Sequence, residues 1–276
     1  MIETTLNKFY YLCTGVLLLF VPYVIMAEQF ELPRNDGSSI HFYLKHSNTV
    51  SQDSLLILLQ GSDCNSVDNN ISLNTDLPKM FPDADVLTVE KYGITNILPY
   101  SKEDVRSDGA LVGEMFTAKS SEVTMLISLV GGADYLLDDM RYNLLQTVPP
   151  EELTEQQDAF EAFIKEILTA KDPIIMNEDN ELGFKWFKSI LSLSRYDSLS
   201  QITQPILLID CGRDSNTSPI ESDKLYQRLN ENNKTNITRI IYPELDHFFT
   251  NKSGKRVLDN VIFDGRQWLK SHIENK

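Results

Sequence analysis

The sequence predicts an α/β fold, in which helices flank a mostly parallel sheet and a helical insertion interrupts the pattern. Short, continuous apolar runs alternate with stretches of helical periodicity, and such runs are typical of strands buried on both faces of a parallel sheet. Polar, glycine-containing residues follow several of these runs, which is where α/β sheets place their binding sites. With 42% hydrophobic and 24% charged residues among 276, the chain has enough apolar material for a packed core.

The first two expected strands form a hairpin, because Phe30–Leu32 and Ile40–Leu44 flank the turn Arg34–Gly37, which contains Asp-Gly. Five further apolar runs predict buried parallel strands: Ser54–Leu59, Asp85–Val89, Thr124–Val130, Pro205–Ile209 and Thr238–Tyr242. Helical patterns accompany these strands at Ser107–Ala118, Pro219–Asn230 and Val257–Ile273. The alternation of the two kinds of element predicts the α/β sheet.

Residues 133–204 break this alternation. Glu151–Ala170 follows a Pro-Pro pair and has a charged, helical pattern, and Phe184–Leu193 has the pattern of an amphipathic helix. We therefore expect residues 133–204 to form a mostly helical cap insertion over one face of the sheet, within a single α/β domain of residues 28–276.

The apolar run Phe9–Ala27 indicates an N-terminal targeting segment. Ala27 is suited to signal cleavage, and Pro22 fits a signal peptide better than a stable membrane helix. The run is also almost long enough to span a bilayer. Residues 1–27 are thus expected to be a signal peptide or a membrane anchor, with a buried N-terminal helix as the third interpretation. The first two interpretations place the domain outside the cytoplasm, as a periplasmic, luminal or secreted protein.

Composition excludes several classes of partner. The chain has 25 Lys and Arg against 40 Asp and Glu, a formal charge of −15, whereas nucleic acids and anionic lipid surfaces need a basic face. No Cys-x-x-Cys or His-Glu-x-x-His motif occurs, so we expect no metal and no cofactor. Cys64 and Cys211 follow the targeting segment, either as one disulfide or as two buried thiols. Cys64 as a thiol nucleophile is less favoured than a structural Cys64.

Three residues form a candidate catalytic set: Ser107, Asp214 and His247. A hydroxyl nucleophile needs a base that takes its proton, and the base needs a carboxylate that holds its tautomer. The other three histidines lie near the N-terminal hairpin or near the end of the last helix. His247 is therefore the best candidate for the base.

Four segments resemble the α/β-hydrolase family, in the family's order along the chain. SLLILLQGSDC resembles the strand and oxyanion loop, and VRSDGALVGEMFTAKSSEVTMLISLVGG resembles the nucleophile elbow with its helix and the next strand. PILLIDCGRD resembles the loop of the catalytic acid, and YPELDH resembles the loop of the catalytic histidine. The order Ser, Asp, His is also that of the family. The resemblance covers nearly all of the chain after the targeting segment.

The resemblance implies a role for each residue of the site. Ser107 would be the nucleophile, His247 the general base and Asp214 the acid that orients the base. The implied oxyanion hole consists of backbone N–H groups at Ser62, next to Gly61, and at Asp108. The implied reaction is transfer of an acyl group from a small-molecule or peptide substrate to water through an acyl-enzyme.

Each of the three residues also has a purely structural interpretation. Ser107 could cap the helix that follows it. Asp214 could cap the next helix or bond within its turn, and Asp210 and Asp246 are its nearest rivals as the catalytic acid. His247 could be a structural loop histidine.

The chain departs from the family just before Ser107. The elbow reads Val-Arg-Ser-Asp-Gly, so Val105 replaces a glycine that the sharp turn favours. Ser107 lies only 107 − 90 = 17 positions after Glu90, and five of the six residues 101–106 are polar or charged, which excludes a doubly buried strand there. A helix and a strand of the family are therefore missing, unless Tyr92–Tyr100 replaces the strand.

Two functions from different classes follow. The first is an exported serine hydrolase that cleaves an ester, thioester or peptide-like acyl substrate, with residues 133–204 shaping the acyl pocket. The second is a catalytically silent α/β-hydrolase-fold protein, either a binding module or the relic of a damaged gene. The two differ in whether Ser107 lies on a strand-to-helix turn within hydrogen-bond reach of His247.

Overall fold

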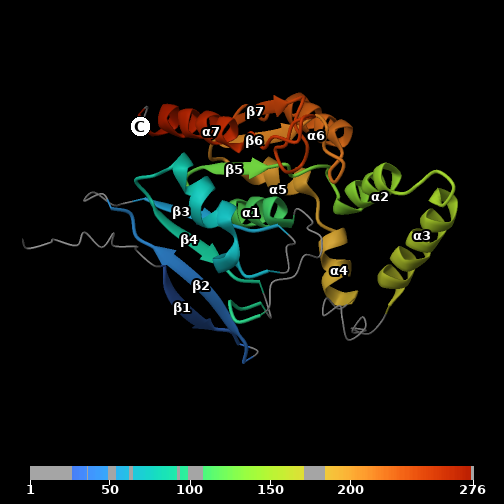
Figure 1. The fold of residues 1–276 in the computed structure, drawn as a ribbon, viewed down its shortest axis with the longest axis horizontal. Coiled ribbons are helices and arrows are strands. Elements are labelled where there is room, and N and C mark those ends of the chain that lie inside the picture. Colours follow the sequence, from blue (N-terminus) through green and yellow to red (C-terminus); the bar gives the residue numbers. More distant parts are fainter. Residues whose placement is uncertain are drawn as a thin grey trace, which may run out of the picture.

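The computed structural model describes residues 27–35, 37–48, 54–61, 65–91, 94–98, 108–170 and 184–274, which form two sheets with helices packed on and beside them (Figure 1). The strands are β1 (Glu28–Pro33), β2 (Ser39–Lys45), β3 (Leu55–Leu58), β4 (Asp85–Val89), β5 (Leu126–Leu129), β6 (Ile206–Cys211) and β7 (Ile237–Tyr242). The helices are α1 (Asp108–Lys119), α2 (Leu136–Thr147), α3 (Leu153–Thr169), α4 (Phe184–Leu191), α5 (Arg195–Gln201), α6 (Pro219–Glu231) and α7 (Leu258–Ile273). Short helical turns are η1 (Val67–Asn69), η2 (Ser72–Asp76) and η3 (Leu77–Met80).

The two sheets confirm the predicted fold class. In the first sheet the strand order is β1-β2-β4-β3. β1 and β2 form the predicted antiparallel hairpin, whose turn includes Gly37 at a φ of 87°. β2 pairs antiparallel with β4, and β4 pairs parallel with β3. The second sheet, β5-β6-β7, is parallel throughout.

The strand predicted at Ser54–Leu59 is present, but its expected burial on both faces is wrong. Leu55 is 51% exposed and Ile57 is 36% exposed. β3 is the last strand of its sheet and β5 is the first strand of the next, so the described residues contain no strand between them. β3 therefore lacks the neighbour that would cover it.

Among the described residues, the sheet is interrupted where the sequence predicts a missing strand. Residues 94–98 form a turn, in which the Leu98 N–H donates to the Thr95 carbonyl at 3.2 Å, and Ile97 is 87% exposed. This part of Tyr92–Tyr100 does not replace the strand, because Asn96 and the proline that follows disfavour strand pairing. The remainder of that stretch, and residues 101–107, lie outside the described residues.

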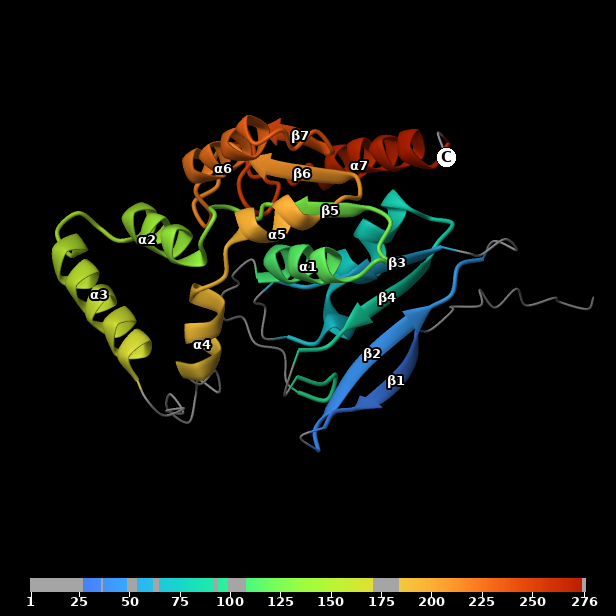
Figure 2. The ribbon, with the colours of Figure 1, turned by 180° about the vertical axis from the view of Figure 1, so that it is seen from behind.

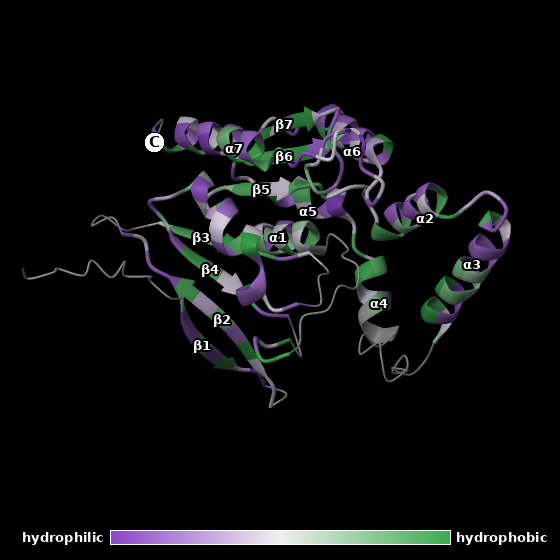
Figure 3. Ribbon diagram, viewed as in Figure 1, coloured by the Kyte–Doolittle hydropathy of each residue, from purple (hydrophilic) through white to green (hydrophobic). Residues whose placement is uncertain are grey.

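The second sheet contains the best-packed part of the core. Ile206 and Leu208 of β6 pack with α5 and α6, whereas Leu207 and Ile209 face the other side and pack with α7. All six residues of β6 are buried, as a doubly covered central strand requires. Figure 3 shows the apolar stretches of β5, β6 and β7 and the mixed polarity of α6 and α7.

Residues 133–204 contain α2, α3, α4 and α5. Helices α3 and α4 pack through Ile164, Ile167, Phe187 and Ile190, and the same apolar cluster includes Leu111 of α1. In two opposite views, α2, α3 and α4 extend to one side of the sheets (Figures 1 and 2). The apolar faces of α3 and α4 therefore pack in one cluster with α1, the helix that follows Ser107.

Residues 1–26, which include most of the predicted targeting segment, lie outside the described residues. Among the helices that the structure does describe, none is long and apolar enough to cross a membrane. Signal cleavage, anchoring and export stay predictions.

Candidate active site

The loops after β6 and β7 bring Asp214 and His247 into direct contact. His247 Nδ1 lies 2.7 Å from Asp214 Oδ2, and the two side chains are 6% and 2% exposed. The carboxyl ends of β6 and β7 point to the same edge of the parallel sheet, which is why residues 33 positions apart meet here. An aspartate on Nδ1 holds an imidazole in one tautomer and orientation.

The Asp214 carboxylate is fixed by its own loop. Its Oδ1 accepts the N–H groups of Asn216 and Thr217 at 2.8 Å each, and its Oδ2 accepts the Thr217 hydroxyl at 2.8 Å. The cap of α6 is Ser218, whose side chain accepts the Glu221 N–H, so Asp214 is not the helix cap. It instead bonds within the turn and also to His247.

The two rival acids have other partners. Asp210 pairs with Arg239 at 2.7 Å and accepts the Ser222 hydroxyl at 2.9 Å. Asp246 accepts the backbone N–H groups of its own loop, two and four residues further on, at 3.0 and 2.8 Å. These contacts give both acids structural roles.

The start of α1 lies against the end of β3. A Cβ atom added to Gly109 would lie 2.7 Å from the carbonyl oxygens of both Leu59 and Gln60, so only glycine fits this position. Lys91 donates from Nζ to the carbonyl oxygen of Gly61, the residue that follows Gln60. The predicted oxyanion loop therefore reaches the start of the predicted nucleophile helix.

Two of the predicted site residues are outside the described part of the chain. Ser107 directly precedes α1, whose first residue is Asp108, and Ser62 directly follows Gly61. Each is thus one residue away from a described position. Their roles stay predictions.

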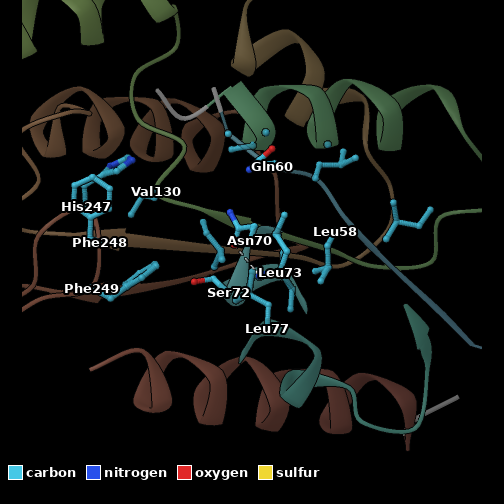
Figure 4. Close-up of a pocket in the computed structure, with 18 of the residues that line it drawn as sticks. Leu58, Gln60, Asn70, Ser72, Leu73, Leu77, Val130, His247, Phe248 and Phe249 are labelled. Carbon is cyan, nitrogen blue, oxygen red and sulfur yellow. Dashed lines mark hydrogen bonds between the residues drawn. The ribbon is translucent and has the colours of Figure 1, made fainter. Parts of the chain in front are cut away.

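A cavity of about 300 Å³ brings the described parts of the site together. Gln60, Gly61, Gly109 and His247 all line it, together with apolar residues from both sheets. Figure 4 shows His247, Phe248 and Phe249 at one end of this cavity, and Gln60 above Asn70 and Leu73. The candidate histidine base, the predicted oxyanion loop and the start of α1 thus face one partly open cavity, an arrangement that suits acyl transfer.

Glu90 was not among the residues predicted for the site. It bonds to the loop that follows Gly61. Its carboxylate accepts the Ser66 hydroxyl, the Val67 N–H at 3.1 Å and the Tyr43 hydroxyl at 3.2 Å. Burial and the charge of Glu90 raise the pKa of Tyr43 to about 12. The sequence feature that could have identified Glu90 is its position directly after the apolar run DVLTV. A carboxylate buried at the end of a strand needs hydrogen-bond partners.

Glu114 and Arg195 form a buried ion pair beneath the site, and the sequence reading missed it as well. Arg195 Nε lies 2.9 Å from Glu114 Oε2, and the two side chains are 6% and 0% exposed. Ser128 donates to Glu114 at 2.7 Å, and Arg195 also donates to the carbonyl of Gly132. Burial opposes the charged guanidinium, but attraction to Glu114 leaves the pKa of Arg195 raised. The pair links α1 to α5.

Helix α2 is attached to the loop of the catalytic-acid candidate. Asp139 accepts the N–H groups of Ala133 at 2.8 Å and Ser218 at 2.7 Å, and the Tyr142 hydroxyl donates to the Asp214 carbonyl at 2.9 Å. Burial raises the pKa of Asp139 to about 7, against the opposing effect of the two N–H groups. The first helix of segment 133–204 therefore supports the position of Asp214.

The remaining thiol and metal candidates do not join this arrangement. Cys211 is a free thiol, and burial raises its pKa to about 12. Cys64 lies outside the described residues. Within the described residues, no group of three or more His, Cys, Asp or Glu could hold a metal ion.

Comparison with solved structures identifies the fold. Est1E from Butyrivibrio proteoclasticus is 14% identical, with a TM-score of 0.58 over 89% of this chain and 99% of that one. An esterase of Pyrococcus furiosus, Pf2001, is 14% identical, with a TM-score of 0.57 over 90% and 91%. A 2,6-dihydroxy-pseudo-oxynicotine hydrolase is 16% identical, with a TM-score of 0.54 over 89% and 67%. No family model and no curated protein matches the sequence. At these identities the likeness concerns the fold alone, and the chain has an α/β-hydrolase-like fold.

Proposed function

We propose that the chain is a serine hydrolase that cleaves an ester, thioester or peptide-like acyl substrate with Ser107, His247 and Asp214. The buried bond of 2.7 Å between His247 Nδ1 and Asp214 Oδ2 is the observation that carries the proposal. A carboxylate on Nδ1 leaves Nε2 to accept a proton from a hydroxyl, which is what a serine nucleophile requires. Structural neighbours named as esterases and hydrolases support the same reaction class.

In the proposed reaction, Ser107 Oγ attacks the substrate carbonyl carbon while His247 Nε2 takes the hydroxyl proton. The tetrahedral intermediate collapses, the bond to the leaving group breaks, and His247 returns the proton to the leaving oxygen, sulfur or nitrogen. Water then attacks the acyl-serine with His247 again as the base. The bond between the acyl carbon and Ser107 Oγ breaks, His247 returns the proton to Oγ, and the acid product leaves. Asp214 stays ionised and stabilises the imidazolium in both halves.

The oxyanion hole in this proposal consists of the backbone N–H groups of Ser62 and Asp108. The close approach of Gly109 to the end of β3 supports this assignment, since it brings α1 next to Gly61. The N-terminus of the 12-residue α1 also favours a developing negative charge. Residues 133–204 would shape the substrate side of the pocket, and the apolar run Phe9–Ala27 would direct the enzyme out of the cytoplasm.

The second candidate function is a catalytically silent α/β-hydrolase-fold protein. The described residues contain no strand between β3 and β5, and this favours it, because the nucleophile elbow is normally reached from a central strand. In that case Asp214 and His247 would keep their contact without an activated serine nearby.

Hydrolysis of p-nitrophenyl butyrate by the full chain and its variants distinguishes the two. We expect Ser107→Ala and His247→Ala to remove activity, and Asp214→Asn to lower kcat by about 10⁴-fold because the imidazole takes the wrong tautomer. Asp246→Asn and His272→Ala are matched controls, since one lies in the same loop as His247 and the other near the end of α7. Folded wild-type protein without activity would support the silent protein instead.

A further inference from the structure

The cavity at the candidate site extends into the space between the two sheets. One wall consists of Ile57 and Leu58 of β3, and the opposite wall consists of Leu126, Ile127 and Leu129 of β5. Neither strand has a partner on this side within the described residues. Between these two strands lies a mostly apolar cavity, which His247 also lines.

The lining of this cavity is mostly apolar, but it also includes polar residues at Asn70, Ser72 and Arg256. Gln60, Gly61 and His247 belong to the reacting end, whereas Leu73 and Leu77 line the cavity from η2 and η3 (Figure 4). Gly113 of α1 leaves room along the helix. A Cβ atom added at Gly113 would lie 3.7 Å from a Leu59 methyl and 3.8 Å from a Leu126 methyl, so position 113 faces the space between the sheets.

We propose that this space binds the hydrocarbon chain of the substrate's acyl group, so that the enzyme prefers medium-chain acyl esters or thioesters. This inference rests on the proposed serine hydrolase function. An alkyl chain suits the site because the walls from β3 and β5 are aliphatic. The polar lining residues Ser72 and Arg256 bond to each other, and Asn70 Oδ1 accepts the Leu73 N–H, so these groups already have partners within the chain.

The volume sets the chain length. An apolar cavity of about 150 Å³ holds benzene, which has six carbons. A cavity of about 300 Å³ is twice as large, so it accommodates an acyl chain of about ten to twelve carbons. Each methylene buried in the transition state should raise kcat/KM by about fourfold until the cavity is full.

The test compares p-nitrophenyl esters from acetate to palmitate, in buffer without detergent, for wild type and two variants of α1. Gly113→Leu places a side chain in the cavity, whereas Val112→Leu adds volume at a position that is 48% exposed. We expect the wild-type optimum near decanoate. Gly113→Leu should lower kcat/KM for decanoate about tenfold or more and leave acetate within about twofold. Val112→Leu should change neither value.

Two results overturn the proposal: equal kcat/KM for acetate and decanoate in the wild type, or an equal loss for all esters in folded Gly113→Leu. The milder Gly113→Ala keeps the test informative if the leucine variant does not fold, and it should shorten the preferred chain slightly. Calorimetry with decanoate separates this inference from the catalytic proposal. Binding of decanoate that is lost in Gly113→Leu supports the channel even without hydrolysis, and hydrolysis without decanoate binding leaves the hydrolase but removes the channel.

Discussion

Replacing one member of the Glu114–Arg195 pair should be among the most damaging single changes in the chain. The two side chains are 0% and 6% exposed, and the guanidinium bonds both carboxylate oxygens, at 2.9 and 2.5 Å. Glu114→Gln keeps the shape but removes the only carboxylate that the described structure shows bonded to this buried guanidinium. We expect it to lower the free energy of unfolding by about 3–5 kcal/mol.

The double variant Glu114→Leu/Arg195→Met should cost much less than the sum of its two single variants. It removes both charges and fills the space with apolar groups, which is often neutral for stability. The coupling energy from the complete cycle should therefore reach about 3 kcal/mol. Urea unfolding followed by far-UV circular dichroism measures all four free energies.

Arg141 and Glu161 form a matched control. Their bond is also bidentate, at 2.7 and 2.9 Å, but the side chains are 45% and 51% exposed. The same cycle on this pair should give less than about 1 kcal/mol. A cost below about 1 kcal/mol for Glu114→Gln, or equal coupling in the two pairs, would refute the reasoning that burial makes the difference.

Three further changes test the support of the site. Gly109→Ala should lower the free energy of unfolding in urea by about 1–3 kcal/mol, since its Cβ would lie 2.7 Å from two backbone carbonyl oxygens. The control Gly113→Ala should be neutral or stabilising by up to about 1 kcal/mol. Equal effects of the two substitutions would contradict the tight packing at Gly109. The Asp139 carboxyl, whose pKa burial raises to about 7 from an unfolded value of about 3.9, binds its proton more tightly in the folded state. The stability that this proton contributes is full below about pH 4 and is lost as the pH rises through about 7. The free energy of unfolding of wild type relative to Asp139→Asn should therefore fall between about pH 4 and pH 7. A difference that does not change with pH would contradict the raised pKa. Glu90→Gln should cost about 1–3 kcal/mol and slow ester hydrolysis, because the carboxylate holds the loop after Gly61; unchanged stability and rate would exclude this positioning role.

The sequence predicted the sheet well, because continuous apolar runs are a local signal. The fully buried β6 matches the run at Pro205–Ile209, and the hairpin matches its Asp-Gly turn. The interruption of the sheet could also be predicted, because residues 101–106 are too polar for a buried strand. The exposure of Leu55 and Ile57 could have followed from the same observation, since removal of a central strand makes its neighbours edges.

The candidate site was predicted only in part. Asp214 and His247 follow apolar strands, so their meeting at one edge of the sheet could be expected. Glu114 and Arg195 lie 81 positions apart and give no local sign of pairing, because a helix surface and a helix start both carry charges routinely. Asp139 is similar: only the folded chain shows that α2 supports the loop of Asp214.

The most direct measurement for the central claim is labelling of the full chain with a fluorophosphonate probe, with the adduct mapped by mass spectrometry. The account predicts one adduct, on Ser107, which disappears in His247→Ala, slows strongly in Asp214→Asn and persists in His272→Ala. Folded protein that carries no adduct, or an adduct on Ser107 that forms equally fast without His247, would show that the buried Asp214–His247 pair does not activate this serine.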